Sequence, residues 1–452
     1  MLHVKIHLSG IGLESFATPL LRGFRPPFRT VGPTRSTVRP KNVARLKNFS
    51  HFCPIPEPRG AESETMAGIY LHIPFCKRIC SYCDFYKSVR TELIDAVTAR
   101  MHRELTERSG YLHDRRIETV YFGGGTPSLC RPEQLGGLIA RIREEFDCSA
   151  LCETTAEVNP DDLTPAYLEG LLHAGIDRLS IGIQSFDDRE LRFMNRRHDA
   201  AAARQAVGEA RRAGFRNLTI DLIFGVPGFG GDTLRHNLEQ TLELRPQHIS
   251  AYHLTIEPDT AFGRRARRGE LRAVEEEVSE AEFRTVHDTL TAAGYEHYEV
   301  SNFALPGFRA RHNSAYWNGR EYLGIGPAAH SFDGRSRRWS TDTAESYAAG
   351  GPLSFEEEML SDRDRRNEYL MTRLRTSDGL SLKAFEAAFG PQAAARLVLE
   401  ARPLLEAETL RREGERLLIP PERFLTSDAV IGTLFEPEPD TARHRPDPLD
   451  AP

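Results

Sequence analysis

The regular alternation of strand-like and helix-like segments constrains the fold of this 452-residue chain more than any other feature. From residue 68 onward, short apolar or alternating runs recur between helical stretches, as in βα units built around a parallel sheet. We expect strands at Ile69–Ile73, Thr119–Phe122, Thr155–Val158, Arg178–Ile183, Asn217–Phe224 and Ile249–Ile256. We expect helices between them at Leu93–Glu107, Pro132–Glu145, Pro165–Ala174, Ala200–Ala213 and Thr233–Leu244. The sequence therefore predicts an α/β fold, a partial (β/α)6 barrel of the TIM type.

The pattern changes beyond residue 260. A further helix is expected at Val274–Ala293, and helical patterns recur at Arg365–Leu374, Leu382–Phe389 and Ala394–Ala401, before a strand-like pair around Leu417–Leu425. This order is typical of a small winged-helix-like module. We therefore expect a barrel over residues 66–300, a linking segment over 301–354 and a C-terminal winged-helix-like domain over 355–435.

The two ends differ in composition from the rest. Residues 1–65 hold ten Lys or Arg against four Asp or Glu, a net charge of +6 in a chain whose total is −6. Such a segment is a disordered basic leader, as in a mitochondrial transit peptide, or the product of a mis-assigned start, and a start at Met66 is the favoured interpretation. The Pro-rich residues 436–452 are expected to form a disordered tail. No run approaches the ~18 apolar residues of a membrane span.

Three cysteines follow the first expected strand with the spacing C-x3-C-x2-C: Cys76, Cys80 and Cys83. Three thiolates are one fewer than a closed tetrahedral zinc site needs, although His72 could supply a fourth ligand. A disulfide framework fits poorly, because the chain has seven cysteines in 452 residues and no recognisable secretory signal. The remaining interpretation is a [4Fe-4S] cluster with one iron free to bind a small ligand.

This loop resembles the signature of the radical S-adenosylmethionine (SAM) enzymes. The resemblance implies that the free iron chelates SAM and that an electron from the cluster cleaves SAM to a 5'-deoxyadenosyl radical. The second expected strand ends in Gly123-Gly124-Gly125-Thr126-Pro127. Glycines allow close backbone approach to a ligand, but alone they more often mark a tight turn. In the radical SAM families this segment, here Gly124, Gly125 and Thr126, binds the methionyl amino group of SAM.

Polar residues also gather at the ends of the later strands, where parallel barrels carry their active sites. Each would be an ordinary surface or capping residue on base rates. Their place makes them candidate contacts for the ribose and carboxylate of SAM: Glu157, Gln184, Arg196 and Asp221. Tyr70 and Tyr82 flank the cysteine loop and are either SAM contacts or plain packing residues.

Four segments together resemble the oxygen-independent coproporphyrinogen III oxidase family, in order from about Ala67 to about Phe435. They are Tyr70–Cys76, Gly123–Pro127, Gly182–Phe186 and Asp221–Gly228. Coproporphyrinogen dehydrogenases of this family carry a fourth cysteine two residues after the third, whereas this chain has Phe85 there. Phe85 is typical of the other branch, the HemW-type heme chaperones, which bind heme and deliver it to apo-hemoproteins.

The segment His312-Asn313-Ser314-Ala315-Tyr316-Trp317 matches the H-N-x-x-Y-W pattern linked to heme binding in that branch. A neutral imidazole can ligate heme iron and aromatic rings can cover a porphyrin face. From spacing alone, these residues would more often pack a junction between domains. With the resemblance, we expect His312 to bind heme.

The leading hypothesis is a cytoplasmic heme chaperone that carries a [4Fe-4S] cluster and a SAM site, and whose partners are heme, an apo-hemoprotein acceptor and an electron donor for the cluster. Two alternatives stay open: a radical SAM decarboxylase of coproporphyrinogen III, and a zinc-bound scaffold. Residues 355–440 hold 12 Lys or Arg against 18 Asp or Glu, so no nucleic-acid partner is expected. Substrate turnover, a homodimer and a peripheral membrane contact are left open.

Overall fold

The computed structural model describes residues 66–437, all within one compact unit of the chain. The expectations for residues 1–65 and 438–452 lie outside the described residues. Among the helices of residues 66–437, none has the length and apolar composition that crossing a bilayer requires.

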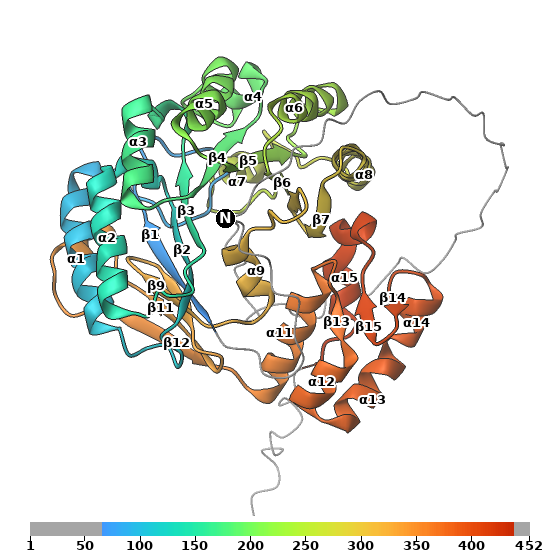
Figure 1. The fold of residues 1–452 in the computed structure, drawn as a ribbon. Helices are drawn as coiled ribbons and strands as arrows, with labels where there is room; N and C mark the ends of the chain where they lie inside the picture. The colour runs from blue at the N-terminus through green and yellow to red at the C-terminus, as the bar shows by residue number, and fades with distance from the viewer. Residues whose placement is uncertain (1–65, 438–452) are drawn as a thin grey trace, which may run out of the picture. The chain divides into compact units, whose positions relative to one another are not determined.

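The predicted α/β architecture is confirmed (Figure 1). Parallel strands β1 to β6 lie side by side in chain order: Ala67–Ile73, Ile117–Gly124, Glu153–Val158, Arg178–Gln184, Asn217–Phe224 and His248–His253. The helices between them match the predicted ones to within a few residues: α1 (Ile94–Glu107), α2 (Pro132–Glu145), α3 (Pro165–Ala174), α5 (Ala200–Ala213) and α6 (Gly231–Leu244). The short helices α4 (Asp188–Phe193) and α7 (Ala261–Arg267) were not predicted, and α8 (Glu276–Ala292) follows.

Six more strands extend this sheet to twelve, so the barrel stays open with β12 and β7 at its edges. Strand β9 (Tyr322–Ile325) runs parallel to β1, and β10 (His330–Phe332), β11 (Ser336–Ser340) and β12 (Phe355–Met359) continue from it antiparallel. On the other side, β8 (Asn302–Ala304) pairs with β6 and β7 (Glu296–Glu299) pairs with β8. The residues expected to link two domains thus include strands of the sheet, and the expected domain start at 355 falls on β12.

The C-terminal part combines helices with a three-stranded sheet of order β13-β15-β14. Its elements are α11 (Asp362–Leu374), β13 (Leu380–Ser381), α12 (Leu382–Phe389), α13 (Pro391–Glu400), α14 (Arg402–Glu406), β14 (Arg411–Glu413), β15 (Arg416–Leu418), a 3₁₀ helix (Pro421–Thr426) and α15 (Ser427–Gly432). The strand pair predicted around 417–425 is wrong in its second half. Pro420 and Pro421 fix their φ angles and lack N–H donors, so the chain turns into the 3₁₀ helix there.

The two faces of the parallel strands differ in polarity. One set of alternate positions is apolar and almost fully buried, for example Leu71, Phe122, Leu179 and Ile220. The other set is polar, aromatic or glycine, and its members contact one another inside the barrel: Gly68, Tyr70, His72, Thr119, Tyr121, Gly123, Glu153, Thr155, Glu157, Arg178, Ser180, Gly182, Thr219, Asp221, His248 and Ser250. Barrel interiors are more often filled by branched apolar side chains. A polar interior suits a bound polar ligand.

Candidate functional site

The three predicted cysteine ligands lie in one loop between β1 and α1. Cys76 is buried, and Cys80 and Cys83 are half-buried. Backbone hydrogen bonds fix the loop, because Cys76 N donates to Ser88 O (2.9 Å) and Cys83 N donates to Cys80 O (3.3 Å). The loop is thus held in shape by its own backbone.

Two side chains donate hydrogen bonds to these sulfurs. Thr126 Oγ1 donates to Cys76 Sγ (3.6 Å), and Arg196 Nη1 donates to Cys80 Sγ (3.3 Å). Burial raises the pKa of the Cys76 thiol to about 11, and burial likewise raises the pKa of Cys83. Thiols of this kind lose their protons when they bind metal, and hydrogen bonds to the sulfurs tune an iron–sulfur cluster. This donor set fits a [4Fe-4S] cluster.

His72 does not complete a zinc site with these cysteines. Its Nδ1 is hydrogen-bonded to the hydroxyl of Tyr70 (3.0 Å), and its Nε2 lies 3.2 Å from the carbonyl oxygen of Tyr86. Within residues 66–437 no three His, Cys, Asp or Glu side chains converge as ligands of a single metal ion. Sulfurs that bind separate irons of one cluster need not meet at one point.

The glycine turn at the end of β2, Gly124 to Thr126, packs against the end of β1. Gly124 has φ +110°, and a Cβ there would lie 2.6 Å from the His72 ring. A Cβ at Gly125 would lie 2.7 Å from the carbonyl oxygen of Phe75, and Gly125 N donates to Ile73 O (2.8 Å). Glycine is therefore required at both positions, and the turn presents backbone groups and Thr126 beside the cysteine loop.

Glu157 lies at the end of β3 and faces this turn. One carboxylate oxygen accepts a hydrogen bond from Gly124 N (3.1 Å), and the other accepts one from the Tyr121 hydroxyl (2.9 Å). Tyr70 stacks on Tyr121 with ring centroids 6.1 Å apart. The predicted residues Gly124, Glu157 and Tyr70 are therefore brought together, and Tyr121 is a member of the group that the sequence reading missed.

Arg196 joins the cysteine loop to the ends of β3 and β4. Besides Cys80, its guanidinium donates to Asn159 Oδ1 (2.7 Å) and to the carbonyl oxygen of Gly182. Burial lowers the pKa of Arg196, but the neighbouring Tyr82 and Cys80 outweigh this effect and raise the pKa above its usual value. Gln184 adopts φ +70°. Its side-chain nitrogen Nε2 lies close to Gly182, since a Cβ at Gly182 would be 3.0 Å from it. Arg196, Gln184 and the cysteine loop thus share one rim of the barrel.

Asp221 and Tyr82 differ in environment, and Tyr82 neighbours the rim residues Cys80 and Arg196. Asp221 lies inside the barrel, where Ser180 Oγ donates to it (3.1 Å), and burial followed by the charge of Glu157 raises its pKa. Tyr82 packs against an apolar cluster of Leu191, Met194, Ile223, Val226, Leu254, Phe262 and Leu271. Tyr82 therefore anchors the loop through packing, whereas Asp221 forms part of the polar interior.

His312 is deeply buried on α9 (Arg311–Trp317), at the end of the barrel opposite the cysteine loop. Its Nδ1 is hydrogen-bonded to Thr119 Oγ1 (2.8 Å) and its Nε2 to the Tyr316 hydroxyl (2.9 Å). Burial, and then Arg178, lower its pKa to about 3, so the imidazole is neutral. His312 nevertheless stacks on Tyr70 as well as on Tyr121, with ring centroids 6.4 and 5.0 Å apart, so both tyrosines link it to the group around Glu157.

Two charged residues at the His312 end of the barrel, Glu153 and Arg178, were not predicted as site residues. Glu153 accepts hydrogen bonds from the backbone N–H groups of Arg311 and His312 (3.0 and 3.1 Å) and lies 4.0 Å from Arg178 Nε. A carboxylate at the N-terminus of α9 complements the exposed N–H groups and the helix dipole. The signal in the sequence was a charged residue at the first position of two otherwise buried strands.

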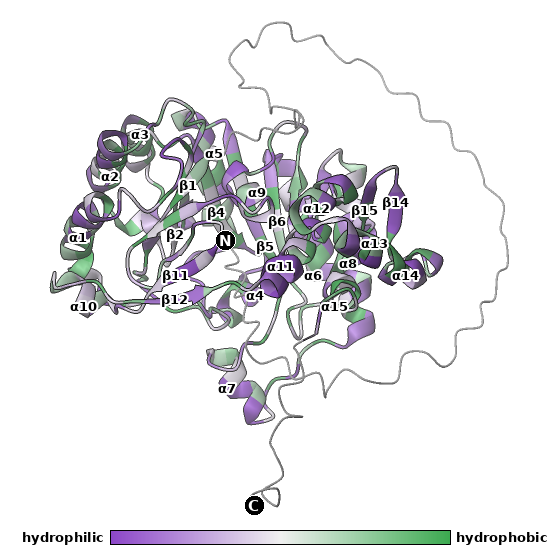
Figure 2. Cartoon of the chain, turned by 90° about the horizontal axis from the view of Figure 1, so that it is seen from below, coloured by the Kyte–Doolittle hydropathy of each residue, from purple (hydrophilic) through white to green (hydrophobic). Residues whose placement is uncertain are grey.

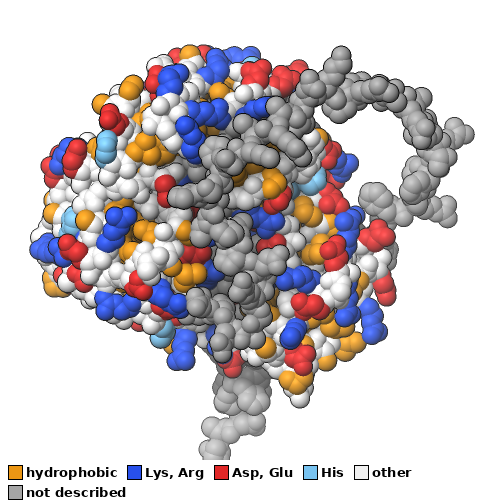
Figure 3. All heavy atoms as spheres, in the orientation of Figure 1, with side chains coloured by type: hydrophobic (Ala, Val, Ile, Leu, Met, Phe, Trp, Pro, Cys, Tyr) orange, Lys and Arg blue, Asp and Glu red, His pale blue; other side chains and the backbone are white. Residues whose placement is uncertain are grey.

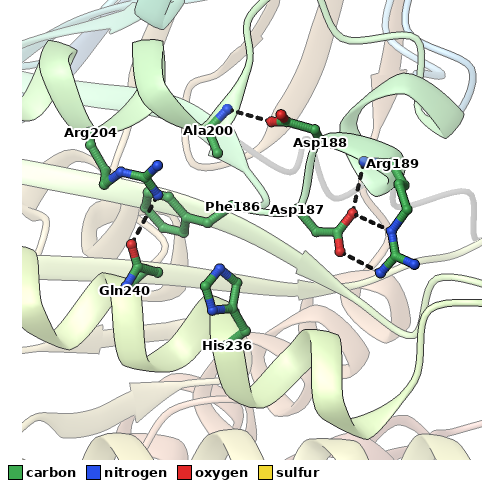
Figure 4. A pocket seen from close by; sticks show the side chains of 8 residues that line it. All are labelled: Phe186, Asp187, Asp188, Arg189, Ala200, Arg204, His236 and Gln240. Atoms are coloured by element: carbon green, nitrogen blue, oxygen red, sulfur yellow. Dashed lines mark hydrogen bonds and ion pairs between the residues drawn. The ribbon is translucent and has the colours of Figure 1, made fainter.

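An open depression of about 530 Å³ lies between α4, α5 and α6 (Figure 4). Its lining residues are Phe186, Asp187, Asp188, Arg189, Ala200, Arg204, His236 and Gln240. Asp187 and Asp188 accept backbone hydrogen bonds from Arg189 and Ala200 (both 2.8 Å), so these carboxylates fix the starts of helices. We assign no ligand to this depression.

Comparison with known proteins gives consistent matches. Residues 70–240 match the Radical SAM superfamily and residues 360–423 match the HemN C-terminal domain. The chain is 36% identical to the heme chaperone HemW of Lactococcus lactis over 71% of this chain and 84% of that protein. It is 35% identical to the heme chaperone HemW of Mycobacterium tuberculosis over 81% of this chain and 94% of that protein. Among solved structures, coproporphyrinogen III oxidase (HemN) of Escherichia coli, a radical SAM enzyme, shares the fold with a TM-score of 0.71 at 22% identity, over 82% of this chain and 90% of that one.

Proposed function

Because the chain belongs to the HemW heme chaperone family of radical SAM proteins, we propose that it binds heme and transfers it to an apo-hemoprotein, and that it carries a [4Fe-4S] cluster and a SAM site. The observation that carries the proposal is the state of His312, a neutral imidazole on α9 within the matching segment. Neutral imidazole is the form that ligates heme iron.

Heme ligation by His312 requires a local rearrangement. Both ring nitrogens are hydrogen-bonded, to Thr119 and Tyr316, and the side chain is 1% exposed. The hydrogen bond at the nitrogen that ligates iron must break, and α9 must shift enough to admit a porphyrin edge. Such a coupling makes heme uptake and release depend on the position of α9.

Cys76, Cys80 and Cys83 would hold the cluster, which supplies one electron to SAM when both are bound. Thr126 and Arg196 hydrogen-bond to two of the sulfurs, which supports this assignment. The proposed SAM contacts are Tyr70, Tyr82, Gly124, Gly125, Thr126, Glu157, Gln184, Arg196 and Asp221. We place the protein in the cytoplasm, since the six cysteines of residues 66–437 are free thiols, as a reducing compartment favours.

The test is an anaerobic hemin titration of reconstituted protein that starts at Met66, followed by absorbance. His312→Ala should abolish saturable binding. His248→Ala is the matched control, because His248 is equally buried inside the barrel and its Nε2 is hydrogen-bonded to the Tyr298 hydroxyl (2.8 Å). His312→Gln, which retains a polar group at the site, guards against misfolding. Unchanged hemin affinity in both His312 variants, or SAM-dependent formation of protoporphyrinogen IX from coproporphyrinogen III, would overturn the proposal.

A further inference from the structure

The C-terminal end of α9 is held by an arginine of the C-terminal part. Arg373, in the last turn of α11, donates to the carbonyl oxygens of Trp317 (3.1 Å) and Asn318 (2.9 Å), and also to the side-chain oxygen of Asn318. The last carbonyl groups of a helix have no partner within it, and a cation there complements the helix dipole. Helices α9 and α11 lie next to each other in Figure 1. We call Arg373, Trp317 and Asn318 the α9 latch.

Every hydrogen bond of the Arg373 side chain within residues 66–437 goes to α9. The guanidinium also lies over the ring of Tyr369, one turn earlier in the same helix and 5.1 Å from the ring centroid, which orients it. The neighbouring Arg375 pairs with a carboxylate, that of Asp428, and cationic and anionic side chains are interspersed on the face seen in Figure 3. Arg373 therefore holds α9 and does not balance a nearby negative charge.

Helix α11 is itself fixed to both sides of the open sheet. Glu368 forms a mostly buried ion pair with Arg337 of β11 (2.6 Å), near one edge of the sheet. Ser377 N, just after the helix, donates to Tyr298 O of β7 (3.0 Å), at the other edge. Figure 2 shows α11 to be largely hydrophilic, in keeping with a helix held by polar bonds as well as by packing. The latch thus ties α9 to an element that the sheet holds from two sides.

A glycine separates the latch from the next fixed point of the chain. Gly319 adopts φ +60°, and no atom lies within 4 Å of its Cβ position. Arg320 follows and pairs with Glu118 of β2. At the other end of α9, Glu153 of β3 accepts the first N–H groups. The helix is therefore fixed to the barrel at its N-terminal end, and the latch holds the end that carries Tyr316.

We propose that Arg373 is a positioning residue for heme: the α9 latch keeps the Tyr316 hydroxyl on His312 Nε2 and must open before heme iron can bind that nitrogen. The proposal rests on the heme site assigned under the proposed function, and it adds the residue that controls access to this site. Holding the end of α9 also holds Tyr316, whose hydroxyl is bonded to His312 Nε2 (2.9 Å). A protein whose binding-competent state is a minor population binds its ligand more weakly by that fraction, so weakening the latch should strengthen heme binding.

The test measures the association and dissociation rates of hemin with the reconstituted full chain by stopped-flow absorbance. Arg373→Met removes the donors, so the association rate should rise about tenfold while the dissociation rate stays within about twofold, because the latch is open in the bound state. A general loosening of the fold would raise both rates. Arg373→Lys, whose single ammonium can donate to the same carbonyl groups, should give an intermediate association rate. Arg375→Met is the control: it removes an equal charge from the same helix end but loses a bond to Asp428, and both rates should match wild type.

Asn318→Ala tests the latch from the other helix. It removes the side-chain acceptor at an exposed position, so it decides the question even if Arg373→Met does not fold. The association rate should rise about threefold, with no further effect when the substitution is combined with Arg373→Met, since that bond is then already lost.

Amide hydrogen exchange measures the latch without heme. Exchange in α9 should be about tenfold faster in Arg373→Met than in wild type, with β2 unchanged. Unchanged exchange in α9, an unchanged hemin association rate in both Arg373→Met and Asn318→Ala, or weaker hemin binding by Arg373→Met, as a direct contact of Arg373 with a heme propionate would give, would overturn the proposal. A wild-type chain that binds no hemin would overturn the proposed function, and the exchange rates would still decide whether Arg373 holds α9.

Discussion

The imidazole of His312 stacks on the phenol ring of Tyr121, with ring centroids 5.0 Å apart and ring planes 25° apart. The hydroxyl of the same tyrosine donates to Glu157, which also accepts the backbone N–H of Gly124. Tyr121 thus connects the residue proposed for heme with the residues proposed for SAM, and Tyr70, itself a proposed SAM contact, also stacks on His312, with ring centroids 6.4 Å apart.

Tyr121→Phe should weaken SAM binding about fivefold while leaving hemin binding unchanged. The substitution keeps the stacking on His312 but removes a hydrogen bond that orients Glu157, a loss of about 1 kcal/mol. Isothermal titration of SAM into reconstituted protein measures the effect. Tyr111→Phe is the control, because the buried Tyr111 hydroxyl has no hydrogen-bond partner within residues 66–437. Equal effects of the two substitutions would count against a role for Tyr121 in placing Glu157.

Gly124→Ala should abolish measurable SAM binding and lower the free energy of unfolding by more than about 2 kcal/mol. The left-handed φ alone costs about 1–2 kcal/mol, and the new Cβ would meet the His72 ring at 2.6 Å. Gly228→Ala isolates the first contribution, since Gly228 has φ +85° with no atom within 4 Å of its Cβ position. Urea denaturation and SAM titration measure both variants. If Gly124→Ala lowers the free energy of unfolding and the SAM affinity no more than Gly228→Ala does, the predicted clash with the His72 ring is wrong.

Tyr316→Phe should strengthen hemin binding about fivefold. It removes the hydroxyl bonded to His312 Nε2, so about 1 kcal/mol less is needed to free that nitrogen. The measurement is the same anaerobic hemin titration, with Tyr167→Phe as the control on the outer helix α3. Weaker binding would indicate instead that the Tyr316 hydroxyl itself contacts heme.

The contribution of Glu190 to the stability of the fold should fall as the pH rises from about 4.5 to about 7. Burial raises the pKa of this carboxyl to about 7 in the folded chain, so the folded state binds more protons than the unfolded state in that window. Its carboxylate accepts hydrogen bonds from Ser185 and Asn237, and the side-chain oxygen of glutamine can accept the same bonds. Glu190→Gln should therefore flatten the pH dependence and stabilise the chain above pH 7, by at most about 3 kcal/mol. Chemical denaturation at several pH values tests this against the exposed Glu239→Gln.

The β1–β6 strands and their helices were predictable because their signals are local. Leu179 and Ile181 alternate with Arg178 and Ser180 within a single strand, and Gly175 ends α3 in the left-handed region that its position requires. The cysteine spacing likewise lies within eight residues. The structure adds the shared rim of Glu157, Gln184 and Arg196, while their contact with SAM stays a prediction.

The missed features depend on contacts between distant parts of the chain. Thr119 and His312 are 193 residues apart, so neither neighbourhood reveals that they are hydrogen-bonded. Strands β7 to β12 are only three to five residues long, and β12 (Phe355–Met359) is also highly charged, so these strands exist because neighbouring strands pair with them. The placement of His312 inside the barrel followed from packing, which the H-N-x-x-Y-W pattern does not record.

The composition of β12 also governs how copies of this protein meet. The strand lies at an open edge of the sheet and carries three consecutive glutamates, Glu356 to Glu358, all exposed. If a second copy extended the sheet across this edge, carboxylates would face carboxylates along the new ladder, which repel. The edge thus protects crowded molecules against continuous strand-to-strand fibre growth, even though the barrel never closes.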